Sequence, residues 1–478
     1  MSATAKELES LDPVTGVRLG SVPVSEAKDV EAMIADATAI QPVWAELPLT
    51  ARARYLRRAA QIVIDEWEEI GELLVREAGV PRTEAWVAEL LPTVRDLHRI
   101  AAHGERALAV KWLRGRRATG AWVREPQRLV SLQGTSRSPF ADPCAGAALA
   151  LMGGSAVLLR LDPACALSGR RVQTIFERAG VPRGLVCCTH GGFPSEAPAP
   201  EIAASAQAPS GAPAAALVLP DADIEGTVAG ALRGAFGGVG RPRTGTLIAV
   251  ADVAARAVEG LTAAGAALTV GDPGAWETEV GPVASAQRLE VAAELLADAR
   301  ATGGQLQPVA EAVTLEGPFL TPTVVTGIAP TARLVREDAG APVLAVLAAG
   351  SEREAVALAA TCGSPDGASV WTADRARAQQ IARLLPARTV WLNGRAESGR
   401  RPMPPASVEW PATRLKRVIW HPPRWRDTWS HPYDERLAFA ARAWVRVSYG
   451  RDTDKRSALR AGAGPMARVA ARSLHGLG

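Results

Sequence analysis

Strands and helices alternate along the middle of this chain at a spacing that restricts it to a small set of folds. The first block of predicted elements is, in order, strand Leu129–Leu132, helix Pro143–Met152, strand Ala156–Arg160, helix Ser168–Ala179 and strand Leu185–Cys188. A strand–helix–strand order at this spacing is typical of parallel strands joined by right-handed crossovers. The alternation resumes with strand Ala214–Leu219 and helix Asp223–Phe236 and continues to about Asn393. We therefore predict an α/β fold.

The flanking regions have a different character. Two short strands joined by turn residues are predicted near the start, and helical periodicity then runs from about Glu26 to Ala101. Ser25 is the predicted N-cap of this helical region, and Gly79 is a predicted helix stop. Residues 113–130 alternate around a Gly-Arg-Arg-Ala-Thr-Gly run and predict an exposed hairpin. Residues 191–213 are rich in Ala, Pro and Ser without periodicity, so we predict a loop there.

Composition excludes several classes of protein. The chain has 478 residues with 47% hydrophobic content, enough for two or three packed domains. Its 54 basic and 50 acidic residues nearly balance, so we expect no nucleic-acid partner. The sequence has no apolar run near the length of a membrane span, so we expect no membrane partner and a cytoplasmic location. Five scattered cysteines predict neither a disulfide framework nor a metal site.

Several short segments between residues 8 and 400 follow one another in a diagnostic order. They are Asp12–Gly16, Trp44–Pro48, Arg52–Arg57, Glu177–Gly184, Pro220–Asp223, Gly317–Val325, Ala341–Val346, Ala368–Thr372 and Thr389–Asn393. Their order and spacing resemble those of the aldehyde dehydrogenase superfamily, and the chain is similar to the catalytically silent half of its two-domain members.

The resemblance implies an aldehyde dehydrogenase-like α/β fold in several parts. A Rossmann-like cofactor domain would span residues 1–112 and 131–213, with an oligomerisation hairpin arm at 113–130. An α/β catalytic-type domain would span 214–400, followed by a Trp- and Arg-rich C-terminal extension and tail at 401–478. Because family members are usually dimers or tetramers, we expect the chain to associate with itself or with an active homologue.

The family's reaction requires a cysteine thiolate that attacks the aldehyde and a glutamate that activates water. At the position of the nucleophile this sequence has Arg243 or, with one residue of slippage, Pro242. No cysteine lies between Cys188 and Cys362, so a small misalignment does not restore the thiolate. The segment at the position of the glutamate, Ser210–Leu217, has no carboxylate. We therefore assign no catalytic residue.

The oxyanion donor of the family, an asparagine, is also replaced. Arg137 or Ser138 takes its position, and a long charged arginine would fill the space that the substrate oxygen needs. An anion site at Arg137 is the alternative interpretation.

The residues that hold the cofactor differ from the family pattern as well. The Lys-Pro-Ser-Glu run that grips the adenosine ribose becomes Arg160–Pro163, where Asp162 is the remaining carboxylate. The second ribose-binding glutamate corresponds to Asp338. We interpret Arg160, Asp162 and Asp338 as vestigial cofactor-binding residues, and we expect no cofactor, or weakened NAD(P) binding.

These observations favour a pseudoenzyme that acts as a structural or regulatory subunit. Two alternatives stay open: an active NAD(P)-dependent aldehyde oxidoreductase with relocated residues such as Cys144, or a small-molecule or nucleotide sensor. The aromatic residues after residue 400 indicate either a docking extension or packing on the chain's own surface.

Overall fold

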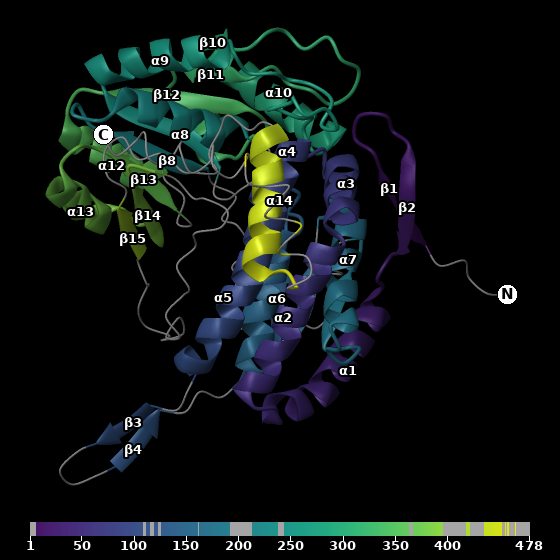
Figure 1. Ribbon diagram of the computed structural model, residues 1–478. Helices are drawn as coiled ribbons and strands as arrows, with labels where there is room; N and C mark the ends of the chain where they lie inside the picture. Colours follow the sequence, from purple (N-terminus) through teal and green to yellow (C-terminus); the bar gives the residue numbers. More distant parts are fainter. Residues whose placement is uncertain are drawn as a thin grey trace.

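The computed structural model describes residues 6–108, 111–114, 119–122, 126–160, 162–191, 213–237, 243–362, 367–394, 417–420 and 435–451, with Lys455, Ser457 and Gly464. Two bodies stack on each other in Figure 1, each built on its own sheet. We call them the three-stranded body, drawn below, and the eight-stranded body, drawn above. Within the described residues, no helix is long and apolar enough to cross a membrane.

The three-stranded body contains a parallel sheet of order β5-β6-β7. Its strands are β5 (Leu129–Gln133), β6 (Ala156–Arg160) and β7 (Val186–Thr189). The helices around it are α1 (Ala27–Glu46), α2 (Leu49–Asp65), α3 (Trp67–Ala78), α4 (Arg82–Glu84), η1 (Ala85–Leu90), α5 (Leu91–Leu108), α6 (Ala141–Gly153), η2 (Pro163–Cys165) and α7 (Ala166–Arg178). Their apolar faces form one hydrophobic core with the strands.

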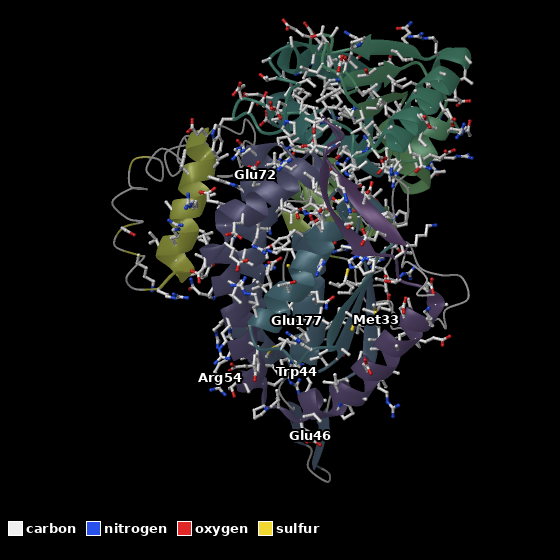
Figure 2. All side chains as sticks on the ribbon, turned by 90° about the vertical axis from the view of Figure 1, so that its right-hand side faces the viewer. Met33, Trp44, Glu46, Arg54, Glu72 and Glu177 are labelled. Carbon is white, nitrogen blue, oxygen red and sulfur yellow. The ribbon has the colours of Figure 1, made fainter. Side chains whose placement is uncertain are left out.

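Long-range hydrogen bonds tie the helices of this body together. The Trp44 indole donates to the Leu151 carbonyl at 2.8 Å, which joins α1 to α6. Figure 2 shows Trp44 low in the three-stranded body. The buried Glu77 carboxylate at the end of α3 accepts from Ser10 and from the backbone N–H groups of Leu167 and Ser168 at the start of α7. A carboxylate at that position satisfies free N–H groups and the positive end of the helix dipole.

The eight-stranded body has the strand order β10-β11-β12-β9-β8-β13-β14-β15, and only β10 runs antiparallel to its neighbour. The strands are β8 (Ala214–Val218), β9 (Thr244–Val250), β10 (Gln305–Pro308), β11 (Thr323–Thr326), β12 (Val343–Ala349), β13 (Ala368–Trp371), β14 (Thr389–Leu392) and β15 (Arg417–Trp420). The helices are α8 (Ile224–Phe236), α9 (Ala251–Gly265), α10 (Ala286–Ala301), α11 (Arg333–Arg336), α12 (Glu352–Cys362) and α13 (Arg375–Leu384). The first two pack on one face of the sheet and the other four on the opposite face, so this body has three layers.

Two antiparallel hairpins lie at the margins. The first pairs β1 (Glu7–Leu11) with β2 (Arg18–Pro23). The second pairs β3 (Lys111–Arg114) with β4 (Thr119–Trp122) and extends away from both bodies (Figure 1). It lies at the place where the sequence predicts an arm.

The helix α14 (Glu435–Tyr449) packs against the three-stranded body beside α5 (Figure 1). Figure 2 shows it along the margin of the same body. Phe439 stacks on Trp276 of the eight-stranded body at 5.6 Å between ring centroids and meets Trp86 edge-on at 5.9 Å. Trp444 and Tyr449 also pack on the chain itself. Packing on the chain's own surface is therefore confirmed for the aromatic residues of α14. Trp410, Trp425, Trp429 and Tyr433 lie outside the described residues.

Candidate functional site

The turn between β5 and α6 carries the positions predicted for the oxyanion donor. It is held by Glu89 of η1, whose carboxylate accepts from the Ser138 hydroxyl at 2.9 Å and from the backbone N–H groups of Phe140 and Ala141 at 2.9 and 2.7 Å. Glu89 is fully buried, and this burial raises its pKa to about 8 even though the three hydrogen bonds act to lower it. The buried Glu89 side chain thus fixes the turn that presents Arg137.

Sequence reasoning did not identify Glu89 as part of the site. The available signal was its place in the run Trp86–Leu91, where it is the one charged residue among apolar neighbours. A buried carboxylate in such a run needs nearby donors. Those donors lie about fifty residues further along the chain, so the sequence alone does not reveal them.

Arg243, predicted at the nucleophile position, directly precedes β9. Its Nε lies 2.6 Å from the Oδ1 of Asp338, and its Nη1 donates to the Val343 carbonyl at 2.5 Å. The Arg243 side chain is only 1% exposed. These two contacts hold the Arg243 guanidinium between β9 and the start of β12.

Asp338, predicted as a ribose-binding carboxylate, is the partner of that guanidinium. Its Oδ1 also accepts from the Gly340 N–H at 3.0 Å. Burial would raise the pKa of Asp338, but the positive charges of Arg243 and Arg137, together with these hydrogen bonds, lower it to about 2. Asp338 is therefore ionised throughout the neutral range.

Arg137 approaches the same place from the three-stranded body. Its Nη2 donates to the Gly237 carbonyl, at the end of α8, at 3.1 Å. The structure thus brings together three residues that were predicted separately, and we call Arg137, Arg243 and Asp338 the arginine–aspartate cluster. It lies where the two bodies meet. It has no thiolate, and a guanidinium stays protonated at neutral pH, so the cluster cannot supply a nucleophile.

Arg160 and Asp162 flank the carboxyl end of β6. The Arg160 carbonyl accepts from the Gly134 N–H, and Asp162 Oδ1 accepts from the Ala164 N–H at 3.1 Å as the N-cap of η2. Crevices at the carboxyl ends of parallel strands are the usual places for nucleotides in α/β folds. Both residues are thus at an edge suited to a dinucleotide, although Asp162 also has a local capping role.

The other chemical candidates are poorly placed. Cys144 is completely buried in α6, and burial raises the pKa of its thiol well above the usual value. The part of the predicted base segment that the structure describes, from residue 213 onward, contributes buried apolar residues to β8. Pro242 and the remainder of that segment lie outside the described residues. Where side chains are described, none form a group of three that could hold a metal ion.

Comparison with known proteins resolves the family. A model of the aldehyde dehydrogenase family matches residues 1–199 and 196–405, which together span most of the chain. The chain belongs to the aldehyde dehydrogenase family. The expected α/β fold of this family is confirmed by solved structures as well.

Individual relatives are similar over most of their length. A betaine aldehyde dehydrogenase of Cereibacter sphaeroides is 28% identical over 417 residues, covering 82% of this chain and 86% of the relative. An NADP-dependent glyceraldehyde-3-phosphate dehydrogenase from Bacillus halodurans, solved with NADP, is 25% identical with a TM-score of 0.74, covering 83% of this chain and 89% of the other. An NAD-dependent benzaldehyde dehydrogenase from Corynebacterium glutamicum has the same TM-score at 23% identity, with coverage of 83% and 92%.

These relatives correct one expectation. The prediction that no cofactor is involved is wrong, because two of these relatives are named as NAD- or NADP-dependent and one of them was solved with NADP bound. The prediction relied on individual side chains such as Arg160 and on the loss of a family glutamate. Dinucleotide sites depend to a large extent on backbone and sheet geometry, and the edge of the parallel sheet is present here.

Proposed function

We propose that this chain is an aldehyde dehydrogenase-family protein that does not carry out the family's thioester chemistry. It would act as a structural or regulatory subunit that associates with itself or with an active homologue. The observation that carries the proposal is the state of Arg243, which is buried and bound to both Asp338 and the Val343 carbonyl. The nucleophile position is filled by a group that has no free electron pair at neutral pH.

The arrangement around Arg243 supports the same proposal. A second guanidinium, that of Arg137, replaces the neutral oxyanion donor and is tied to the Gly237 carbonyl. The positive charge of Arg137 also acts on Asp338, but the Oδ1 of Asp338 is bound by Arg243, so one carboxylate faces two guanidiniums. The contacts described for both guanidiniums are therefore to protein acceptors, namely Asp338 and the carbonyls of Gly237 and Val343, whereas a reaction centre keeps its donors aimed at substrate atoms.

Binding of NAD or NADP is part of the proposal. The relatives supply the ligand class, and Arg160 and Asp162 at the carboxyl edge of β6 are the residues that would hold the adenosine end. When bound, the nicotinamide would offer a hydride acceptor, but this chain has no thiolate to generate the hydride donor. The Oδ1 of Asp338 is bound by Arg243 and Gly340, so a ribose hydroxyl would have to be held by Oδ2.

Turnover measurements test the first part. Purified protein is incubated with betaine aldehyde or benzaldehyde and with NAD⁺ or NADP⁺, and the reduced cofactor is followed by absorbance. We expect no turnover above buffer, while an active relative under the same conditions provides the positive control. Sustained formation of reduced cofactor that depends on the aldehyde would overturn the proposal.

Cofactor binding is measured separately by calorimetry with NAD⁺ and NADP⁺. We expect binding that is weakened about tenfold by Arg160→Ala, which corresponds to the loss of one charge-assisted hydrogen bond. The matched control is Arg170→Ala, which removes a charge from α7. Equal affinity of the Arg160→Ala variant and the control would show that the dinucleotide is held elsewhere.

Association is tested by light scattering of the purified chain and by affinity capture from its own cells. We expect either a homo-oligomer or co-purification with an active aldehyde dehydrogenase. A monomer that recovers no such partner would contradict the subunit role.

A further inference from the structure

The eight-stranded sheet has a groove at the edge opposite the arginine–aspartate cluster. The cluster lies at the amino ends of β9 and β12, because Arg243 precedes the first and Asp338 precedes the second. The groove has a volume of about 1010 Å³ and includes the carboxyl ends of β11 and β12, with α9 as one wall. It is therefore separate from the site described above, and any ligand it binds is independent of the proposed function.

The chain topology explains why α9 forms a wall of the groove. After β9 the chain continues into α9 on one face, whereas after β12 it continues into α12 on the other face. The strand β12 therefore lies under α9 although its own following helix packs on the opposite face. The groove lies on the β11 side of β12, since none of the described residues that line it belongs to β9.

The edge of β12 is also open in the groove. On the β11 side, pairing with β12 ends at Val325 and Ala345, since the chain turns away at Gly327, which has a φ of +73°. On the β9 side, pairing continues to Ala349. Among the described residues, no strand pairs with Val346–Ala348 on the β11 side.

The direction of the free backbone groups follows from strand alternation. The Thr323 N–H donates to the Pro342 carbonyl, so even-numbered residues of this strand turn their backbone groups toward β11. The pairing of Val325 with Ala345 uses the Val346 N–H, which bonds to the Val325 carbonyl, so the Val346 carbonyl and both backbone groups of Ala348 face the groove. Ala348 is exposed. An exposed strand edge of this kind pairs readily with a further strand.

The walls of the groove specify the side chains that such a strand would carry. They are mainly apolar, with Ala254 and Val258 on α9 and Ile328 and Pro330 on the opposite side. Of the described residues that line the groove, Glu259 alone is charged, and it is exposed on α9. A partner strand would thus bury small apolar side chains and place a basic one near Glu259.

We propose that this groove binds an extended peptide segment of a partner protein by strand addition to β12. The segment would pair with the Val346 carbonyl and with the N–H and carbonyl of Ala348, which at about 3.3 Å per residue accommodates about three residues. Alternating apolar and basic residues match its walls and the carboxylate of Glu259.

The test uses a fluorescein-labelled peptide of alternating valine and lysine, titrated into the full chain and followed by fluorescence anisotropy. Saturable binding is expected, and Glu259→Lys should weaken it on the order of fivefold through loss of one ion pair and the added repulsion. The control Glu290→Lys makes the same charge change on α10, which covers the other face of the sheet, and should leave binding unchanged.

A backbone variant separates strand addition from attraction of charge alone. Ala348→Pro removes an N–H that faces the groove rather than β9, so it should reduce binding on the order of fivefold while the melting temperature confirms folding. Absence of peptide binding overturns the proposal, as does equal binding by the Glu259→Lys and Glu290→Lys variants. If a small alkylammonium ion saturates the groove but the peptide does not displace it, the groove is a small-molecule site and the proposal is also overturned.

Discussion

The carboxylate of Asp338 lies 2.6 Å from the guanidinium of Arg243, although 95 residues separate them in the sequence. The parallel pairing of β9 with β12, in which Thr246 lies opposite Ala345, brings the segments before the two strands together. The ion pair is therefore a consequence of sheet register. It occupies the two positions at which the family resemblance places the nucleophile and a ribose ligand.

Breaking this pair should destabilise the protein. Asp338→Asn leaves the Arg243 guanidinium, which is 1% exposed, with its charge uncompensated. Loss of one partner of a fully buried pair costs about 3–5 kcal/mol. Since the Asp338 side chain is 26% exposed, solvent screening reduces the expected loss to about 2 kcal/mol of unfolding free energy.

Urea denaturation measures this loss, and the neighbouring Glu337→Gln is its control. Glu337 pairs with Arg333 on the surface, with side chains 47% and 50% exposed, so its loss should change stability by less than about 0.5 kcal/mol. Equal stability of the two variants would show that the buried pair contributes no more than a surface pair.

The fold could be predicted in the places where local pattern and tertiary structure agree. Strand Ala156–Arg160 was predicted with the bounds it has, because its apolar run is bounded by Gly-Ser before it and Asp-Pro after it. The predicted N-cap was one residue early. Glu26 caps α1, while the Ser25 hydroxyl accepts from the His190 N–H, a contact between distant segments that no local rule reveals.

The candidate site was predictable as separate positions but not as a cluster. The family resemblance located Arg137, Arg243 and Asp338 one at a time. That both guanidiniums meet at the single carboxylate of Asp338 depends on how the two bodies meet and on the register of β9 against β12. The groove beside β12 left no sequence signal, because it results from the early turn of β11 at Gly327.

The buried Glu89 and the half-buried His98 and His190 give opposing contributions to the pH dependence of stability. Burial, with some repulsion from Arg57 and Arg170, lowers the pKa of His98 and His190 from 6.5 to about 4. The folded state favours the neutral form of both histidines, so their contribution to stability is present above pH 6.5 and is lost as the pH falls toward 4. Burial raises the pKa of Glu89 from 4.5 to about 8, so its contribution is present below pH 4.5 and is lost as the pH rises through 8.

These contributions predict maximal stability near pH 6.5. Of these three groups only Glu89 titrates above that pH, and the unfolding free energy should fall by at most about 1.4 kcal/mol per pH unit up to pH 8. Below pH 6.5 the stability lost by protonation of the two histidines exceeds the stability gained by protonation of Glu89. In Glu89→Gln the decline between pH 6.5 and 8 should disappear in denaturation experiments. A decline that persists in this variant would assign the titration to another group.

The contact between Phe439 and Trp276 should couple α14 to both bodies. Phe439→Ala removes ring contacts with Trp86 and Trp276 and should cost about 1 kcal/mol of stability. Hydrogen exchange should increase both in α14 and around Trp276. The control is Glu435→Gln at the exposed start of the same helix. Faster exchange in α14 alone would mean that the helix does not connect the two bodies.

The five cysteines should be unreactive in the folded protein. All of them are buried and unpaired, and burial raises the thiol pKa of each one, including Cys144 in α6 and the adjacent Cys187 and Cys188. A thiolate is the reactive form, so an aromatic disulfide reagent at pH 8 should label almost none in the native state and all five in denaturant. Cys144→Ser is the informative variant, because a relocated catalytic cysteine would be labelled rapidly in the native protein and that labelling would disappear with the substitution. Fast labelling of this kind would support the alternative that the chain is an active oxidoreductase with a relocated cysteine, and it would count against the non-catalytic role. If labelling instead appears only above the urea midpoint and at the rate of unfolding, all five thiols serve the hydrophobic cores in which they lie.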